Sequence, residues 1–216
     1  TGLIFEKKKC IGVKFIQKGK EHEIFAGKEI VLSGGAVNSP HILQVSGIGP
    51  RHHLQSIGVK TVHDLPGVGQ NLQDHYVSRI SHRVKNTVSI NQLSRGIRLL
   101  REIGSWVFEG KGALTFGITS AMVFSRSREG LSSPDIQLLF TPASYSQKTH
   151  GELEKEGGMT VVVCPVRPSS RGTIMAESSD ALIRPLIRPN YLSDPDDIRV
   201  MIAGLRQARE ILAQPA

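Results

Sequence analysis

The chain has 216 residues, of which 39% are hydrophobic and 21% are charged. This composition suffices for one large domain or two small ones with a buried core, and it excludes a disordered or low-complexity chain. No stretch approaches the roughly 20 apolar residues that a membrane-spanning helix needs. The two cysteines, Cys10 and Cys164, lie far apart in the sequence. A disulfide framework and a zinc finger of cysteine pairs are therefore excluded.

The chain is basic, with 27 lysines and arginines against 19 acidic residues, which gives a formal net charge of +8. Such a balance raises the question of binding to nucleic acid or to an acidic membrane. The basic residues gather at 7–9 and at Arg95, Arg98 and Arg101, and neither group is interleaved with aromatic residues. We interpret both groups as solvated faces and expect no nucleic-acid partner. A polyanion-binding domain is a weaker alternative.

Short β-type runs and turn signals fill the beginning of the chain. The runs cover residues 2–5, 12–16, 22–25 and 28–33. The turn Lys18-Gly19-Lys20 predicts a hairpin across residues 11–25. The apolar run within residues 28–33 favours a strand that is covered on both faces.

A glycine-rich turn and two short helices are predicted next. Residues 33–36 form the turn, and Ser39 followed by Pro40 is typical of an N-cap and the first helical position. Gly47 ends this helix as a left-handed residue. The same pattern predicts a second short helix within residues 50–58.

The composition changes near His75, where we place a domain boundary. Residues 66–75 are typical of a loop whose two glycines allow close backbone approach. Further strands are expected at residues 76–85, 120–124, 135–141, 159–166 and 173–176. Helices do not separate most of these strands, which favours an antiparallel sheet. The predicted fold class is α+β (mixed), with an α/β part in residues 1–75 and an antiparallel sheet flanked by helices in residues 76–216.

Two helices are expected beside this sheet. The apolar face of the first consists of Ile90, Leu93, Ile97, Leu100 and Ile103. The second is capped by Ser193 or Asp194, has Pro195 in its first turn, and presents a buried stripe. That stripe consists of Ile198, Met201, Leu205 and Leu212. Helix capping explains the aspartates near its start, so we expect no metal site.

The strand, glycine turn and helix across residues 28–45 suit a bound nucleotide. Glycine lets a ribose or phosphate approach the backbone, and a helix N-terminus favours an anion. A tightly packed turn with a purely structural role is the commoner explanation of such a segment. The pattern alone leaves both interpretations open.

The segment GAVNSPHILQVSGIG, residues 35–49, resembles position for position the second signature of the glucose–methanol–choline (GMC) family of flavin oxidoreductases. The likeness extends to segments at residues 28–33, 65–75, 168–172 and 190–197. It thus covers nearly the whole chain. The resemblance implies an enzyme that binds FAD and oxidises an alcohol to a carbonyl, with electrons passing to oxygen or to a quinone.

The resemblance also assigns roles to particular residues. It implies that residues 1–75 form the later part of an FAD-binding domain, where Ser33, Gly34 and Gly35 contact the ADP half of the cofactor. The family usually has alanine where Gly34 stands. Residues 76–216 resemble the substrate-binding domain, incomplete at its C-terminus.

Two family features are missing from the sequence. The G-x-G-x-x-G turn that holds the pyrophosphate does not occur, and the catalytic histidine of the family is expected beyond Ala216. We therefore expect an internal fragment that binds FAD weakly or not at all and does not turn over by itself. Its localisation is open between the cytoplasm and the periphery of a membrane, since a targeting peptide would precede Thr1.

The resemblance places the substrate pocket at the strand that contains Ser120 and Met122. Choline-oxidising relatives carry a glutamate that pairs with the quaternary ammonium, and alignment of Phe124-Ser125-Arg126-Ser127 puts Ser120 at that position. A hydroxyl supplies no negative charge, so we expect a neutral aliphatic or aromatic alcohol as substrate. A non-catalytic binding module that reuses the fold is the alternative from a different functional class.

The histidines outside these motifs are interpreted as packing or surface residues. They are His41, His52, His53 and His82. His75 belongs to the loop that shapes the domain junction in the resembling family, and we expect a structural role for it too.

Overall fold

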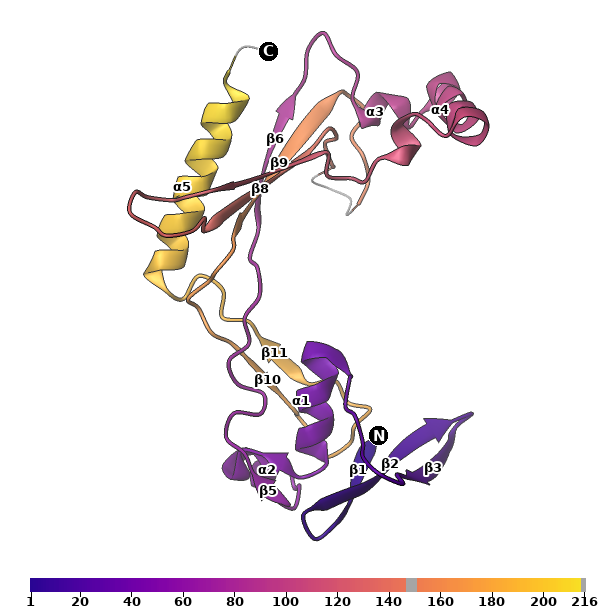
Figure 1. Ribbon diagram of the computed structural model, residues 1–216, viewed down its shortest axis with the longest axis vertical. Helices are drawn as coiled ribbons and strands as arrows, with labels where there is room; N and C mark the ends of the chain where they lie inside the picture. Colours follow the sequence, from indigo (N-terminus) through magenta and orange to yellow (C-terminus); the bar gives the residue numbers. More distant parts are fainter. Residues whose placement is uncertain (147–150, 215–216) are drawn as a thin grey trace. The chain divides into compact units, whose positions relative to one another are not determined.

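The computed structural model describes residues 1–146 and 151–214, which divide into two compact units (Figure 1). The first unit comprises Thr1–Asp74 and Ser170–Ser193, and the second comprises His75–Ser169 and Asp194–Ala216. Each unit mixes helices and strands, which confirms the predicted fold class.

The first unit begins with a three-stranded antiparallel sheet in the order β1-β2-β3. The strands are β1 (Gly2–Glu6), β2 (Lys9–Gln17) and β3 (Lys20–Phe25). Lys18 and Gly19, at the turn between β2 and β3, both have positive φ angles, of 52° and 76°. Two positive φ angles are the signature of the tight hairpin turns that match strand twist, so the predicted hairpin is confirmed.

The strand predicted at residues 28–33 is wrong, because no β-structure forms there. Val31 is 77% exposed, and no described strand pairs with this segment. A strand is stable only where neighbouring strands satisfy its backbone and bury its side chains. The apolar residues of this run favour burial, but within the described residues none of them is buried.

The first helix, α1 (Gly35–Val45), begins earlier than the sequence indicated. Gly34 is its N-cap, and Pro40 lies inside the helix rather than at its first position. The predicted end is correct, since Gly47 follows the helix with a φ angle of 91°. The second helix is α2 (Arg51–Ser56), preceded by Pro50 as N-cap.

A buried amide joins α1 to a strand that lies far away in the sequence. Gln44 has no exposed surface, and its Nε2 donates to the carbonyl oxygen of Ile174 at 2.9 Å. Its Oε1 accepts from the backbone nitrogen of Ala176 at 3.0 Å. Ile174 belongs to β10 (Thr173–Met175), which pairs antiparallel with β11 (Leu186–Arg188). The remaining strands, β4 (Ile48–Gly49) and β5 (His63–Asp64), pair in parallel.

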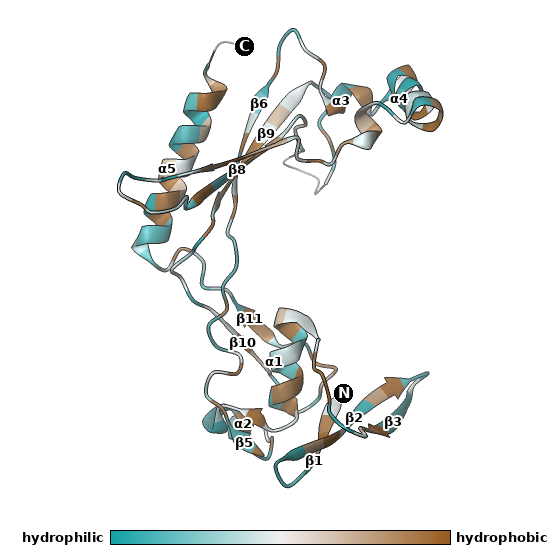
Figure 2. Ribbon diagram, viewed as in Figure 1, coloured by the Kyte–Doolittle hydropathy of each residue, from teal (hydrophilic) through white to brown (hydrophobic). Residues whose placement is uncertain are grey.

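The second unit is built on a four-stranded antiparallel sheet in the order β6-β9-β8-β7, as predicted. The strands are β6 (Ser78–Arg83), β7 (Ala121–Ser125), β8 (Ile136–Thr141) and β9 (Gly158–Pro165). One face packs against α5 (Pro195–Leu212) through Leu138, Val161 and Val163. Figure 2 shows the hydrophobic residues of these strands beside that helix.

The start of α5 follows the prediction, and its buried stripe differs from it. The Asp194 side chain accepts a hydrogen bond from the backbone nitrogen of Asp196, and Pro195 opens the helix. Ile198 is 42% exposed, so its predicted burial is wrong. The buried positions are Asp197, Val200, Met201, Gly204 and Ala208.

The single helix expected around residues 90–103 is also wrong. The segment forms two helices, α3 (Ile90–Leu93) and α4 (Gly96–Glu109), which are followed by the short 3-10 helix η1 (Ala113–Thr115). The apolar residues continue at helical spacing across this segment, but the helix is interrupted near Gly96, which has a φ angle of 58°. The predicted apolar face of α4 exists, but it is not buried, because α4 contains no buried residue.

The compact units differ from the expected division at residue 75 in one respect. Residues 170–193, which we assigned to the second part, pack in the first unit. The reason is the contact of β10 with α1 through Gln44, together with the bridge between Leu72 and Gly172. The functional names of the two domains stay predictions.

None of the helices within the described residues is both long and apolar enough to cross a membrane.

Close contact between α5 and the sheet predicts that Gly204 tolerates no side chain. A Cβ atom there would lie 2.5 Å from Cγ1 of Val163. We expect Gly204→Ala to lower the free energy of unfolding by about 1–2 kcal/mol, as overpacking does. Gly104→Ala in α4 is the matched control, because no atom lies within 4 Å of the position that its Cβ would take. Urea unfolding should show a gain of up to about 1 kcal/mol for that control, and equal effects at both glycines would contradict the packing.

Candidate functional site

The turn before α1 is largely open to solvent. Ser33 and Gly35 are exposed and Gly34 is half-buried. Gly35 has a φ angle of 77°, and no atom lies within 4 Å of the position that a Cβ would take. A planar or charged ligand can therefore reach this backbone directly. The corner predicted to bind the nucleotide is not filled by side chains.

The N-terminus of α1 is unsatisfied at the same corner. No side chain caps the helix, and its first turn contains no acidic residue. The first N–H groups of a helix lack partners inside the helix and carry a partial positive charge. This helix end therefore suits an anionic group such as a phosphate.

A hollow of about 490 Å³ adjoins the first turns of α1. Ala36, Ser39, Pro40 and Leu43 line it from the helix, and Ile174 lines it from β10. The loop at residues 67–73 forms the other wall. The hollow falls within the size range of small-molecule and cofactor sites.

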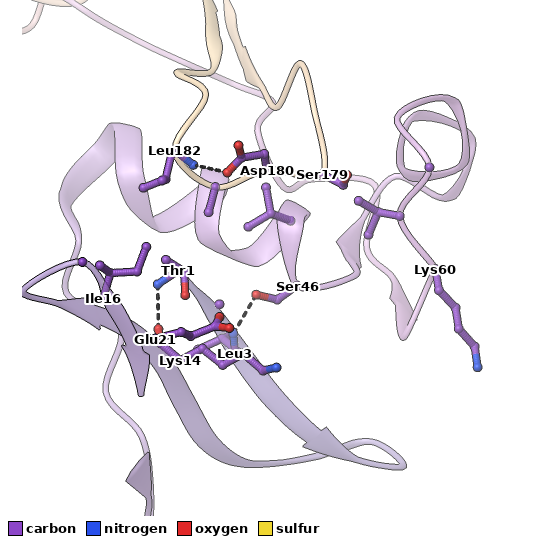
Figure 3. A pocket seen from close by; sticks show the side chains of 16 residues that line it. Thr1, Leu3, Lys14, Ile16, Glu21, Ser46, Lys60, Ser179, Asp180 and Leu182 are labelled. Atoms are coloured by element: carbon purple, nitrogen blue, oxygen red, sulfur yellow. Dashed lines mark hydrogen bonds between the residues drawn. The ribbon is translucent and has the colours of Figure 1, made fainter. Parts of the chain in front are cut away.

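A larger hollow of about 660 Å³ lies at the opposite end of α1, beside the hairpin (Figure 3). One of its polar groups serves the fold, since the Ser46 hydroxyl accepts a hydrogen bond from the backbone nitrogen of Leu3 at 2.9 Å. Val45 and Ser46 at the C-terminal end of the helix line it. A helix C-terminus carries partial negative charge, which disfavours phosphate. We therefore place the candidate site at the smaller hollow.

The loop at residues 66–75 approaches β10 rather than a ligand at one of its glycines. A Cβ at Gly69 would lie 2.4 Å from the carbonyl oxygen of Ile174, and the Ile174 nitrogen donates to the Gly69 carbonyl at 2.7 Å. Gly67 differs, because its Cβ position has no atom within 4 Å. Gly69 thus holds the wall of the hollow in place, and Gly67 leaves that wall accessible.

The predicted substrate residues lie at the edge strand of the second unit. Ser120 directly precedes β7, and its hydroxyl donates to the carbonyl oxygen of Phe140 at 3.2 Å. Met122 is 52% exposed and accepts a hydrogen bond from Nε2 of Gln137 at 3.0 Å. Both residues are accessible.

Strand register adds residues that the sequence did not single out. Met122 pairs with Leu139, and Leu139 pairs with Val162. Because side chains alternate between the faces of a sheet, all three lie opposite the face that α5 covers. Arg79 pairs with Val162 and shares this open face. Only the pairing of strands distant in sequence could have revealed this group.

The structure describes the surroundings of the histidines that the sequence analysis set aside. His41 in α1 is 5% exposed, and its Nε2 has no hydrogen-bond partner among the described residues. Burial lowers the pKa of His41 below its ordinary value. His75 donates from Nε2 to the carbonyl oxygen of Val166 at 3.0 Å. Within the described ranges 1–146 and 151–214, no three metal-ligating side chains come together.

Comparison with known proteins identifies the family of this chain. Family models of GMC oxidoreductase match residues 1–77 and 168–216. The chain is 38% identical over 223 residues to an alcohol dehydrogenase [acceptor] of Pseudomonas putida and 37% identical over 218 residues to the mitochondrial choline dehydrogenase of Homo sapiens. It covers 40% and 36% of those two proteins, and they cover 100% and 99% of this chain.

A solved structure gives the same result. A formate oxidase of Aspergillus oryzae, studied for modification of its FAD, superimposes with a TM-score of 0.85 at 27% identity. The match covers 98% of this chain and 42% of that chain. The chain belongs to the GMC oxidoreductase family, and it spans about two fifths of the length of the relatives that it matches.

Burial of His41 predicts a loss of stability in acid. The lowered pKa means that the folded protein favours the neutral ring. The contribution of His41 to the free energy of unfolding should therefore be fully present above about pH 6.5, the ordinary histidine pKa. It should be lost as the pH falls below that value toward the lowered pKa of the folded state. Urea midpoints measured from pH 7.5 to 4.5 should show this loss reduced in His41→Gln. His52→Gln on the exposed surface of α2 should keep it, and an identical acid profile for His41→Gln and the unchanged protein would contradict the prediction.

Proposed function

We propose that the protein containing this chain is an FAD-dependent oxidoreductase that oxidises the CH–OH group of a neutral alcohol. The observation that carries the proposal is the open corner at Gly35, where an uncapped helix N-terminus adjoins a hollow of about 490 Å³. Membership of the GMC oxidoreductase family supports FAD as the ligand of this corner. When bound, FAD supplies a flavin that accepts hydride from the alcohol carbon.

The residues of the first unit have a binding role in this proposal. The backbone N–H groups at the start of α1 attract the phosphates of the ADP half, and Ser33 offers a hydroxyl at the same turn. Gly34 and Gly35 keep the backbone approachable. Gly34 has a second reason to lack a side chain, since a Cβ there would lie 3.2 Å from the Cβ of Asn38.

The charge of the open sheet face supports a neutral substrate over choline. None of the residues that β6, β7, β8 and β9 place on this face is acidic, and Arg79 adds a positive charge. A quaternary ammonium needs a carboxylate or an aromatic cage for recognition. Met122, Leu139 and Val162 instead offer an apolar surface, which suits the carbon chain or ring of an alcohol.

The names of relatives in this family state different substrates and different electron acceptors. The Pseudomonas putida protein is an alcohol dehydrogenase that uses an acceptor, and the Photobacterium profundum relative is an oxygen-dependent choline dehydrogenase. We propose a quinone or oxygen as the electron acceptor of the whole protein. An assay with both acceptors in parallel distinguishes them.

The proposed FAD corner predicts a selective effect of bulk at Gly35. Gly35→Leu should weaken FAD binding to the whole protein at least about tenfold, because the side chain enters the approach to the backbone. Gly58→Leu is the matched control, since Gly58 has a φ angle of 75° and also has no atom within 4 Å of its Cβ position. Both variants place leucine at nearly the same positive φ angle, 77° at Gly35 and 75° at Gly58. Equal FAD affinity in the two variants, measured by flavin fluorescence titration, would contradict the assignment.

The proposed substrate face predicts a change of specificity at Ser120. The whole protein should reduce an artificial acceptor with primary alcohols and should ignore choline. Ser120→Glu should raise kcat/KM for choline at least about tenfold by supplying a carboxylate near the open face. Ser120→Gln, of similar shape without charge, should not. Rapid choline turnover by the unchanged protein, with no activity on neutral alcohols, would overturn the proposal.

A further inference from the structure

The open face of the second sheet ends in a row of hydroxyl side chains, two of which are buried. Ser81 pairs with Thr160, and Thr160 pairs with Thr141. Each of them lies two positions along its strand from a residue of the open face, so all three hydroxyls belong to that face. Thr141 and Thr160 are only 4% and 1% exposed. Because α5 packs on the opposite face, a different segment covers this row.

The covering segment is the connection between β8 and β9, which the structure describes at residues 142–146 and 151–157. Thr160 Oγ1 donates to the carbonyl oxygen of Ala143 at 2.8 Å. Gly158 shares the open face with Thr160, and a Cβ there would lie 2.6 Å from the Cβ of Ser144. Residues 142–144 thus fold back over the end of the open face, and we call them the end wall.

The end wall stands next to the residues at which we place the substrate. The row of hydroxyls lies two residues, or about 7 Å, along the strands from Met122, Leu139 and Val162. Ser120 lies at the same end, since its backbone nitrogen donates to the carbonyl oxygen of Phe140 at 2.9 Å. An alcohol whose carbon chain extends along the strands toward Ser120 therefore meets the end wall.

Asn91 in α3 holds the end wall through a side chain that has no exposed surface. Its Nδ2 donates to the carbonyl oxygens of Ser144 at 2.7 Å and Glu154 at 3.0 Å. Its Oδ1 accepts from the backbone nitrogen of Ser144 at 2.9 Å. Loss of this amide would remove three hydrogen bonds from the connection at once, and buried backbone groups are costly to leave unpaired.

The start of α3 fixes Asn91 in turn. The hydroxyl of Ser89, the N-cap, donates to Oδ1 of Asn91 at 3.2 Å and accepts from the backbone nitrogen of Gly158 at 3.2 Å. The backbone nitrogen of Ile90 donates to the carbonyl oxygen of Pro142 at 2.9 Å. The end wall, the start of β9 and α3 therefore form one hydrogen-bonded network, which fixes the place of the wall on the open face.

We propose that Asn91 is a positioning residue that sets the length of the alcohol which the open face accepts. It holds residues 142–144 where they block a longer carbon chain, and it touches no substrate itself. The proposal rests on the proposed function, which places the alcohol on this face. An apolar site distinguishes substrates that differ by one methylene by roughly 10–200-fold, provided that its wall does not yield. A purely structural amide would lower stability and leave this discrimination unchanged.

Steady-state kinetics of the whole protein test this proposal, with straight-chain alcohols from ethanol to decanol and with para-alkyl benzyl alcohols. For the unchanged protein, kcat/KM should fall at least about tenfold with one or two methylenes beyond the best chain length. Asn91→Ala should reduce this fall to less than about threefold, because the wall can then yield. It should raise KM for the best alcohol and keep kcat within about twofold, because Asn91 contacts no reacting atom.

Gln207→Ala is the matched control, since Gln207 lies on α5, on the opposite side of the sheet. Its amide also joins two segments, because Nε2 donates to the carbonyl oxygen of Arg126 at 2.8 Å and Oε1 accepts from the hydroxyl of Ser125 at 2.6 Å. This variant should lower the urea midpoint of unfolding without changing the dependence of kcat/KM on chain length.

Thr160→Val covers the case in which Asn91→Ala does not fold. Valine has nearly the shape of threonine but cannot donate to Ala143, so this variant should relax the chain-length dependence in the same direction and to a smaller degree. A dependence that shows no fall in the unchanged protein, that neither variant changes, or that Gln207→Ala changes equally would overturn the role of Asn91 and leave the proposed function intact. No turnover of either alcohol series by the unchanged protein would overturn the proposed function and this role with it.

Discussion

The buried side chain of Gln44 is the interaction on which the candidate site depends. It satisfies a carbonyl oxygen and an N–H group of the β10 segment, 130 and 132 residues further along the chain. Unpaired buried amide groups are costly, so removal of this side chain would leave both backbone groups in an apolar interior. The clamp fixes Ile174 as one wall of the hollow, and no side chain caps the N-terminus of α1, whose first turns line the same hollow.

Local chemistry predicted much of this fold. Glycines in the left-handed region end α1 and α2, Lys18 and Gly19 make the hairpin turn, and Asp194 caps α5. Each of these features depends on a few adjacent residues, so it can be predicted from the local sequence. The same is true of the turn at Gly34 and Gly35, where the sequence itself shows that no side chains are present.

Features that depend on distant partners could not be predicted in the same way. The apolar run at residues 28–33 has the composition of a strand but no described neighbour to pair with, and the helical period of residues 90–103 continues across a break at Gly96. Leu139 and Val162 join Met122 only because three strands pair in a particular register. Ile198 was wrongly placed in the buried stripe, because α5 turns a different set of residues, around Gly204, toward the sheet.

The two units therefore offer different chemistry: the first has an uncapped helix N-terminus at an open corner, which we propose binds an anionic group, and the second has a sheet face whose residues are uncharged or basic. The central claim is that the corner holds the ADP half of FAD, and photoaffinity labelling of the whole protein with 8-azidoadenine FAD tests it most directly. The account predicts that the labelled peptide contains residues from the turn at Ser33–Gly35 or from the lining of the adjacent hollow. Labelling confined to residues of the larger hollow beside the hairpin, or to the second unit, would contradict it.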